Sequence, residues 1–244
     1  MSEFITSEVT EHFVKITFDD GKVNAMSHSL LRGLHDAFDA AAAHKKSVVL
    51  SGRPGIFSAG FDLNVLRGDS AVDRHILLRL GAELALKILT FPLPVIAACT
   101  GHALPMGAFL MLASDVRVGV EGAFGIGMNE VAIGLTVPHF AVELARSRLT
   151  PAYFSRSITT GERFAPHEAA AAGYLDIVVP ANELQQKVED IATALTVGTH
   201  LPSHAASKLR ARQPTIDAMR RAIDTELTLE NFVAATAQSR KQVA

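Results

Sequence analysis

Three short segments carry residues whose types and spacing can do chemistry. Glu130 stands in 126–135 (IGMNEVAIGL), where apolar and small neighbours predict a buried carboxyl with a raised pKa. Segments 57–63 (FSAGFDL) and 100–108 (TGHALPMGA) each place small residues before an expected helix start. Backbone N–H groups in the first turn of a helix lack intrahelical acceptors. Two such groups aimed at one point form an oxyanion hole, beside which a carboxylate can act as a general base.

The same segments also have ordinary interpretations. Each strand-to-helix segment is typical of a plain structural turn, and structural carboxylates outnumber catalytic ones. Segment 122–130 fails the G-x-G-x-x-G pattern because Glu130 occupies the third glycine position. Ser58 lacks the G-x-S-x-G elbow, and no H-E-x-x-H is present, so neither a serine nucleophile nor a metal site is predicted. Cys99 ends an apolar run, which favours a buried, inert thiol.

Composition excludes several classes of protein. The chain has 244 residues, 23 Lys+Arg, 25 Asp+Glu and a net charge of −2, so it lacks the basic surface that nucleic acid requires. A single cysteine excludes a disulfide framework. No segment has the pattern of a signal peptide or a membrane span, so we expect a cytoplasmic protein that does not bind membranes. Aromatic residues make up only 6%, and small residues are plentiful.

Strand and helix patterns alternate and predict a mixed α/β core. Strands are expected at 12–18, 47–50, 94–99, 116–120 and 174–179, and helices at 27–44, up to 89, at 105–113, and from 151 and 166. From 181 onward the pattern is helical only, with breaks expected at Pro202 and Pro214. Residues 201–244 carry seven Lys/Arg against four Asp/Glu. We therefore predict an α/β core at 1–185 and a helical assembly region at 186–244.

In this order and spacing, the three segments resemble the crotonase superfamily of enoyl-CoA hydratases and isomerases. The similarity runs over about two thirds of the chain, from 22–25 (KVNA) to 173–180, and includes 94–107, Ser114-Asp115 and Phe124-Gly125. It implies a spiral of ββα repeats followed by a C-terminal helical region that assembles homotrimers or dimers of trimers. It also implies an acyl-CoA thioester as substrate and no separate cofactor, because coenzyme A is part of the substrate.

The resemblance also assigns roles to particular residues. It implies that the N–H groups of Phe61 and Met106 form the oxyanion hole and that Glu130 is the catalytic acid/base. No metal is implied. The residues that it places along the substrate or its CoA moiety are Lys22, Ala25, Ala59, Gly60, Asp62, Leu63, Asn64, Gly107 and Phe109.

Departures from the family pattern bear on the reaction. Hydratases of the family use two glutamates to position and activate water. At the position of the first glutamate this sequence has Phe109, which cannot activate water. Asn129-Glu130 and Pro105 are similar to features of single-glutamate Δ3,Δ2-enoyl-CoA isomerases, so we expect the shift of a C=C bond through an enolate. A 2-enoyl-CoA hydratase and a non-catalytic acyl-CoA-binding homologue are the alternatives, since the usual glycine loop is substituted by 105–107 (PMG).

Overall fold

The backbone forms one six-stranded sheet and two small sheets. The computed structural model describes residues 3–243, with side chains described up to 238. The main sheet contains β1 (Ile5–Val9), β2 (Phe13–Phe18), β4 (Ser47–Ser51), β7 (Val95–Cys99), β9 (Val116–Val120) and β10 (Ile177–Val179). They lie in the order β1-β2-β4-β7-β9-β10, and every neighbouring pair is parallel except the antiparallel β1–β2 pair.

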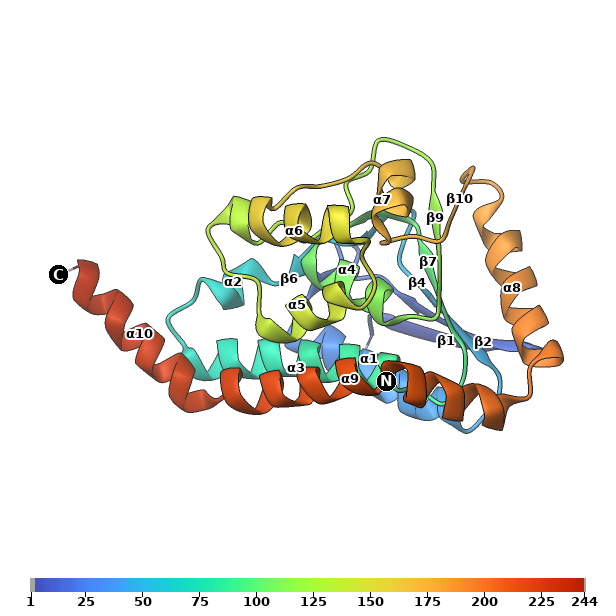
Figure 1. Cartoon of the computed structure of the whole chain (residues 1–244), viewed down its shortest axis with the longest axis horizontal. Helices are drawn as coiled ribbons and strands as arrows, with labels where there is room; N and C mark the ends of the chain where they lie inside the picture. Colours follow the sequence, from blue (N-terminus) through green and yellow to red (C-terminus); the bar gives the residue numbers. More distant parts are fainter. Residues whose placement is uncertain (1–2, 244) are drawn as a thin grey trace.

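The parallel strands β2, β4 and β7 are each followed by one or two short strands and then by a helix. The short strands are β3 (Ala25–Met26), β5 (Gly55–Ser58), β6 (Gly60–Phe61) and β8 (Gly101–Ala103), paired β3 with β6 and β5 with β8. The helices that complete these turns are α1 (His28–Ala42), α2 (Leu63–Leu66), α3 (Ala71–Leu89) and α4 (Pro105–Ala113). The chain thus winds as the predicted spiral of ββα repeats (Figure 1).

Alternating side chains give the main sheet two apolar faces. Val48 and Leu50 belong to the larger core beneath α1, α3 and α4, whereas Val49 faces the smaller core beneath α8 (Leu184–Gly198). All nine residues of α4 are buried, so this helix lies in the centre of the larger core. At the opposite face, α8 covers β2, β4, β7 and β9 (Figure 1). The sheet is therefore enclosed on both sides, as its parallel strands require.

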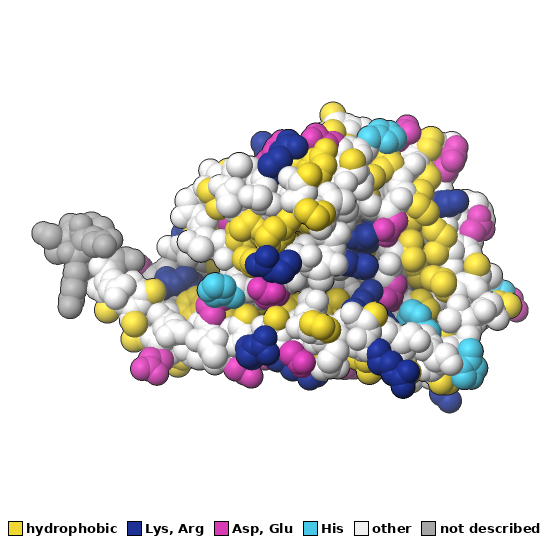
Figure 2. Space-filling view, in the orientation of Figure 1, with side chains coloured by type: hydrophobic (Ala, Val, Ile, Leu, Met, Phe, Trp, Pro, Cys, Tyr) yellow, Lys and Arg dark blue, Asp and Glu magenta, His cyan; other side chains and the backbone are white. Residues whose placement is uncertain are grey.

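The second half of the chain packs around this spiral. It contains the 3₁₀ turn η1 (Val131–Ile133) and the helices α5 (His139–Arg146), α6 (Pro151–Thr160), α7 (Pro166–Ala172), α9 (Leu201–Glu226) and α10 (Leu229–Val243). Helix α9 lies along α3 and α5 (Figure 1), and α10 contacts α3 before it extends beyond the body of the molecule (Figure 2).

Two basic residues of the C-terminal segment form ion pairs inside the fold. Lys208 Nζ and Arg212 Nη2 lie 2.7 and 2.8 Å from the carboxylate oxygens of Asp115, in the turn between α4 and β9. The Asp115 carboxylate also accepts a hydrogen bond from Val95 N at 2.8 Å. The predicted boundary near 185 falls in the first turn of α8, and the division into two regions stays a prediction.

Two predictions about local structure are wrong, and one is confirmed. The break expected at Pro202 is present, because α8 ends at Gly198 and α9 begins at Leu201 with Pro202 in its first turn, where no N–H is needed. The break expected at Pro214 is absent. Pro214 lies inside α9 but is exposed, so water can replace the missing donor. The strand expected at 174–179 begins only at Ile177, since Tyr174 N still donates to Ala169 O at the end of α7. Strand β1 was not expected, because as an edge strand it buries only Ile5.

One structural observation bears on the prediction that the protein does not bind membranes. Within residues 3–243, none of the helices combines the length and the apolar character that crossing a bilayer demands.

Candidate active site

Glu130 is buried without a hydrogen-bond partner for its carboxylate. The residue is 5% exposed and directly precedes η1, with its carbonyl oxygen accepting from Ile133 N and Leu135 N. Neither carboxylate oxygen has a hydrogen-bond partner. Desolvation raises the pKa of the carboxyl from 4.5 to about 7. The predicted burial and raised pKa are confirmed, whereas the catalytic role of Glu130 stays a prediction.

The segment that carries Glu130 is fixed by its backbone. Ile126 bridges Ala103 at the end of β8 and Phe164, so the loop continues the small sheet. Gly127 adopts a φ of +154°, and a Cβ there would lie 2.7 Å from the carbonyl oxygen of Glu162. Only glycine allows this close approach, which brings the following residues toward the core.

Burying Glu130 should cost stability at neutral and higher pH. Between pH 4.5 and about 7 the folded state binds the Glu130 proton while the unfolded state has released it, so stability falls as pH rises through this window. Glu130→Gln removes the ionisation. We expect the variant to be more stable than the wild type at pH 8, by up to about 3 kcal/mol, and similar at pH 4.5.

Urea unfolding at both pH values measures this difference. Glu8→Gln is the matched control, because Glu8 is exposed on the edge strand β1 and should give no gain at pH 8. A Glu130→Gln gain that is the same at pH 4.5 and pH 8 would contradict burial of the charged form as its cause.

The two predicted donor residues lie beside each other. Met106 is the second residue of α4, a position whose N–H has no intrahelical acceptor. The chain before Phe61 approaches this helix start closely: a Cβ on Gly60 (φ +96°) would lie 3.2 Å from Pro105 Cδ. The side chains of Phe61 and Met106 both reach Gly81 of α3, where a Cβ would lie 2.4 Å from the Phe61 ring and 3.0 Å from the Met106 sulfur.

Two buried polar residues join the loops around these donors. Ser58 Oγ donates to Asn24 O at 2.7 Å and accepts from Gly60 N at 3.0 Å. The Asn24 amide nitrogen donates to Phe18 O and Phe57 O, both at 3.1 Å, from a left-handed backbone conformation with φ 52°. These positioning roles were missed in the sequence, where only the left-handed preference of asparagine offers a signal.

Two adjoining cavities meet at Glu130. The first, about 140 Å³, is lined by Ala59, Gly60, Phe61, Leu63, Leu66, Leu104, Pro105, Asn129, Glu130, Ile133 and Leu135. The second, about 280 Å³, is lined by Phe61, Leu66, Arg74, Leu78, Glu130, Leu135, Thr136, Pro138, Phe232 and Ala235. They share Phe61, Leu66, Glu130 and Leu135, and Glu130 is the only carboxylate among the described residues of either wall. A ligand can therefore run from the start of α4 past Glu130 toward α3 and α10.

The predicted substrate-binding residues divide into two groups. Ala59, Gly60 and Leu63 line the first cavity with Glu130. The others line neither cavity. They are Lys22, in the loop before β3; Ala25, the first residue of β3; Asp62 and Asn64, at the start of α2, where the Asp62 carboxylate accepts from Asn64 N; and Gly107 and Phe109, buried in α4. The Phe109 ring packs edge-on against Phe140, with centroids 5.4 Å apart, and no carboxylate stands there.

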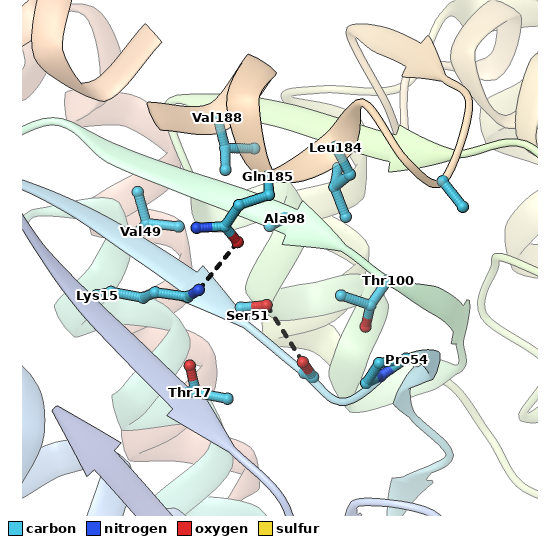
Figure 3. A pocket seen from close by; sticks show the side chains of 12 residues that line it. Lys15, Thr17, Val49, Ser51, Pro54, Ala98, Thr100, Leu184, Gln185 and Val188 are labelled. Carbon is cyan, nitrogen blue, oxygen red and sulfur yellow. Dashed lines mark hydrogen bonds between the residues drawn. The ribbon is translucent and has the colours of Figure 1, made fainter. Parts of the chain in front are cut away.

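A separate pocket lies on the far side of the sheet, between α8 and strands β2, β4 and β7 (Figure 3). Its volume is about 310 Å³, and no carboxylate lines it. Lys15 Nζ donates to Gln185 Oε1 at 2.9 Å across this pocket, which ties α8 to β2 (Figure 3). Among the described residues, no group of three or more His, Cys, Asp or Glu side chains is arranged to hold a metal ion. The cavities at Glu130 are therefore the candidate active site.

Solved structures with the same architecture identify the class of fold. An enoyl-CoA hydratase/isomerase family protein from Pseudomonas syringae is 39% identical, with a TM-score of 0.90 over 93% of this chain and 97% of that one. A Mycobacterium tuberculosis protein, described as an enoyl-CoA isomerase with one of its structures and as a probable enoyl-CoA hydratase with another, is 36% identical in the first, with a TM-score of 0.87 over 92% and 97% of the two chains. The chain thus has the crotonase fold, with the predicted ββα spiral and C-terminal helical region.

Sequence comparison gives the family. The human mitochondrial enoyl-CoA delta isomerase 1 is 27% identical over 221 residues, which are 89% of this chain and 72% of that protein. The family model described as enoyl-CoA hydratase/isomerase matches residues 8–243. This chain belongs to the enoyl-CoA hydratase/isomerase family, whose members act on acyl-CoA thioesters.

Proposed function

We propose that this protein is an enoyl-CoA isomerase that moves a C=C bond from C3 to C2 of the acyl chain, with Glu130 as its single acid/base. The observation that carries this proposal is that, among the residues that the structure describes, Glu130 is the only carboxylate in the two cavities and lies in one wall with Gly60, Phe61 and Pro105. Its pKa of about 7 allows the carboxyl to accept and return a proton near neutral pH.

In the proposed reaction, the thioester oxygen binds between the N–H groups of Phe61 and Met106. The Glu130 carboxylate removes a proton from C2, the electron pair of that C–H bond forms a C1=C2 bond, and the C=O π electrons move to the thioester oxygen to give an enolate. The two N–H groups stabilise this negative charge as it forms. The enolate then forms the C2=C3 bond as the C3=C4 electrons take the proton from Glu130 at C4. No water or cofactor is consumed, and the carboxylate is regenerated.

The residue at position 109 favours isomerisation over hydration. Hydration of a 2-enoyl-CoA needs a group that positions and activates water, and the family's first glutamate is Phe109 here. The Phe109 ring is fully buried against Phe140, so it leaves no polar group at that place.

The same proposal includes the CoA moiety and the assembly of the protein. CoA binds near Lys22, Ala25, Asp62 and Asn64, and the chains assemble into homotrimers or dimers of trimers.

Purified protein assayed on 3-hexenoyl-CoA and 2-hexenoyl-CoA tests the proposal. We expect formation of the 2-enoyl thioester to be at least about a hundredfold faster than formation of the 3-hydroxyacyl thioester, the usual contribution of one positioned acid/base. Faster hydration would replace the isomerase with the hydratase. Tight binding of both thioesters with no turnover would instead identify a non-catalytic acyl-CoA-binding homologue.

A further inference from the structure

One positively charged side chain, Arg74, lines the second cavity in the part that the first cavity does not share. Beyond the four residues it shares with the first cavity, its walls are Arg74, Leu78, Thr136, Pro138, Phe232 and Ala235. These residues come from α3, α10 and the 130–138 loop, and only Arg74 among them is charged. Because Arg74 lines only this part, it lies away from Gly60 and Pro105, where the proposed function places the thioester.

Among the described side chains and backbone groups, Arg74 bonds only to uncharged partners. Its Nη1 donates to Gly68 O and its Nη2 donates to Thr236 Oγ1 of α10. No carboxylate of residues 3–238 lies within 4.0 Å of its guanidinium. The two carboxylate oxygens of Glu130 have no hydrogen-bond partner, so Arg74 and Glu130 do not form an ion pair across the cavity. The guanidinium, with five N–H donors, has donors left for a ligand.

An acyl chain that ends in an alkyl group does not suit a cavity wall that contains the Arg74 guanidinium. It would displace water from a half-buried guanidinium and give no hydrogen bond in return, which is costly for a charged group. A carboxylate has the complementary charge and can accept two parallel N–H bonds from arginine. The apolar residues Leu78, Pro138 and Phe232 then suit the methylene groups between the two ends.

We infer that Arg74 selects acyl-CoA thioesters whose acyl chain ends in a carboxylate. This inference rests on the proposed function for the direction of the substrate: the thioester lies at Phe61 and Met106, and the chain passes Glu130 toward α3. Arg74 is then a specificity-determining residue for the distal end of the substrate.

Calorimetric binding of saturated thioesters tests the inference without requiring turnover. The probes are pairs of equal chain length, succinyl-CoA with butyryl-CoA, adipoyl-CoA with hexanoyl-CoA, and suberoyl-CoA with octanoyl-CoA. For at least one pair we expect the wild type to bind the carboxylate-ended thioester at least about tenfold more tightly, as one charge-assisted contact provides. In Arg74→Met, which keeps an unbranched apolar side chain, that ratio should fall to one or below.

Thr236→Val is the matched control, since it removes the same link between α3 and α10 while it keeps the cation. It should retain the wild-type ratio. Tighter binding of the alkyl thioester by the wild type in every pair, or equal loss of the ratio in Thr236→Val and Arg74→Met, would overturn the inference. A retained ratio in a protein that does not isomerise 3-enoyl-CoA would overturn only the proposed function.

Discussion

Glu130→Gln is expected to lower kcat for isomerisation of 3-hexenoyl-CoA by about a thousandfold, with KM within about threefold of the wild-type value. The amide has nearly the volume of the carboxyl and fills the same buried space, but it cannot take a proton from C2. Because no other carboxylate of the described part of the chain lines the two cavities, no neighbouring acid there can substitute for it. Steady-state kinetics at pH 8, where most of the wild-type carboxyl is ionised, give the largest difference.

The control for this loss is Glu8→Gln, whose side chain is exposed on β1. It should retain wild-type kcat and KM. The Glu130→Gln protein should also unfold no more easily than the wild type, which separates a chemical loss from a folding defect. An unchanged kcat in a folded Glu130→Gln variant would exclude Glu130 as the acid/base.

Gly107→Ala is expected to lower kcat/KM by about a hundredfold through a shift of one donor loop. A Cβ on Gly107 would lie 2.9 Å from Ser58 Cβ, which is closer than real Cβ contacts come, and 3.3 Å from Ser58 O, which is a tight contact. The first turn of α4 would then move away from the segment that leads to Phe61. Since Met106 lies in this turn, its N–H would no longer point to the same place as that of Phe61.

The matched substitution is Gly198→Ala, at the end of α8, where a Cβ would meet nothing within 4 Å. Alanine is the better helix former at either site, so propensity alone would stabilise both variants. We expect wild-type kcat/KM for Gly198→Ala and a folded, slower Gly107→Ala protein. Wild-type turnover by Gly107→Ala would show that the separation of the two loops is not critical.

Local signals in the sequence predicted the elements that carry the candidate site. Pro105 at the first position of α4 and Asp62 as the N-cap of α2 fix where both helices begin. The apolar neighbours of Glu130 predicted its burial, because a loop of small and apolar residues offers a carboxyl no polar contact. The family resemblance supplied the pairing of these segments, which spacing alone left open.

Local sequence patterns could not predict the wall of the second cavity that α3 and α10 form. Arg74 and Phe232 are brought together only by the packing of α10 on α3, across more than 150 positions of chain. Neither residue has a local pattern that sets it apart from other helical residues. Long-range packing likewise decides that Phe109 faces Phe140 and not the cavity, which its position in the family pattern did not indicate.

The contribution of α10 to the cavity also has a consequence for local unfolding. Phe232 and Ala235 are carried by α10, which packs on α3, so the cavity wall is incomplete whenever this helix detaches. In that open state solvent reaches Glu130 from the α10 side, and hydration should hold its pKa closer to the ordinary value. Under the proposed function, detachment of α10 alone, with the ββα spiral intact, is therefore sufficient to remove the tuned acid/base.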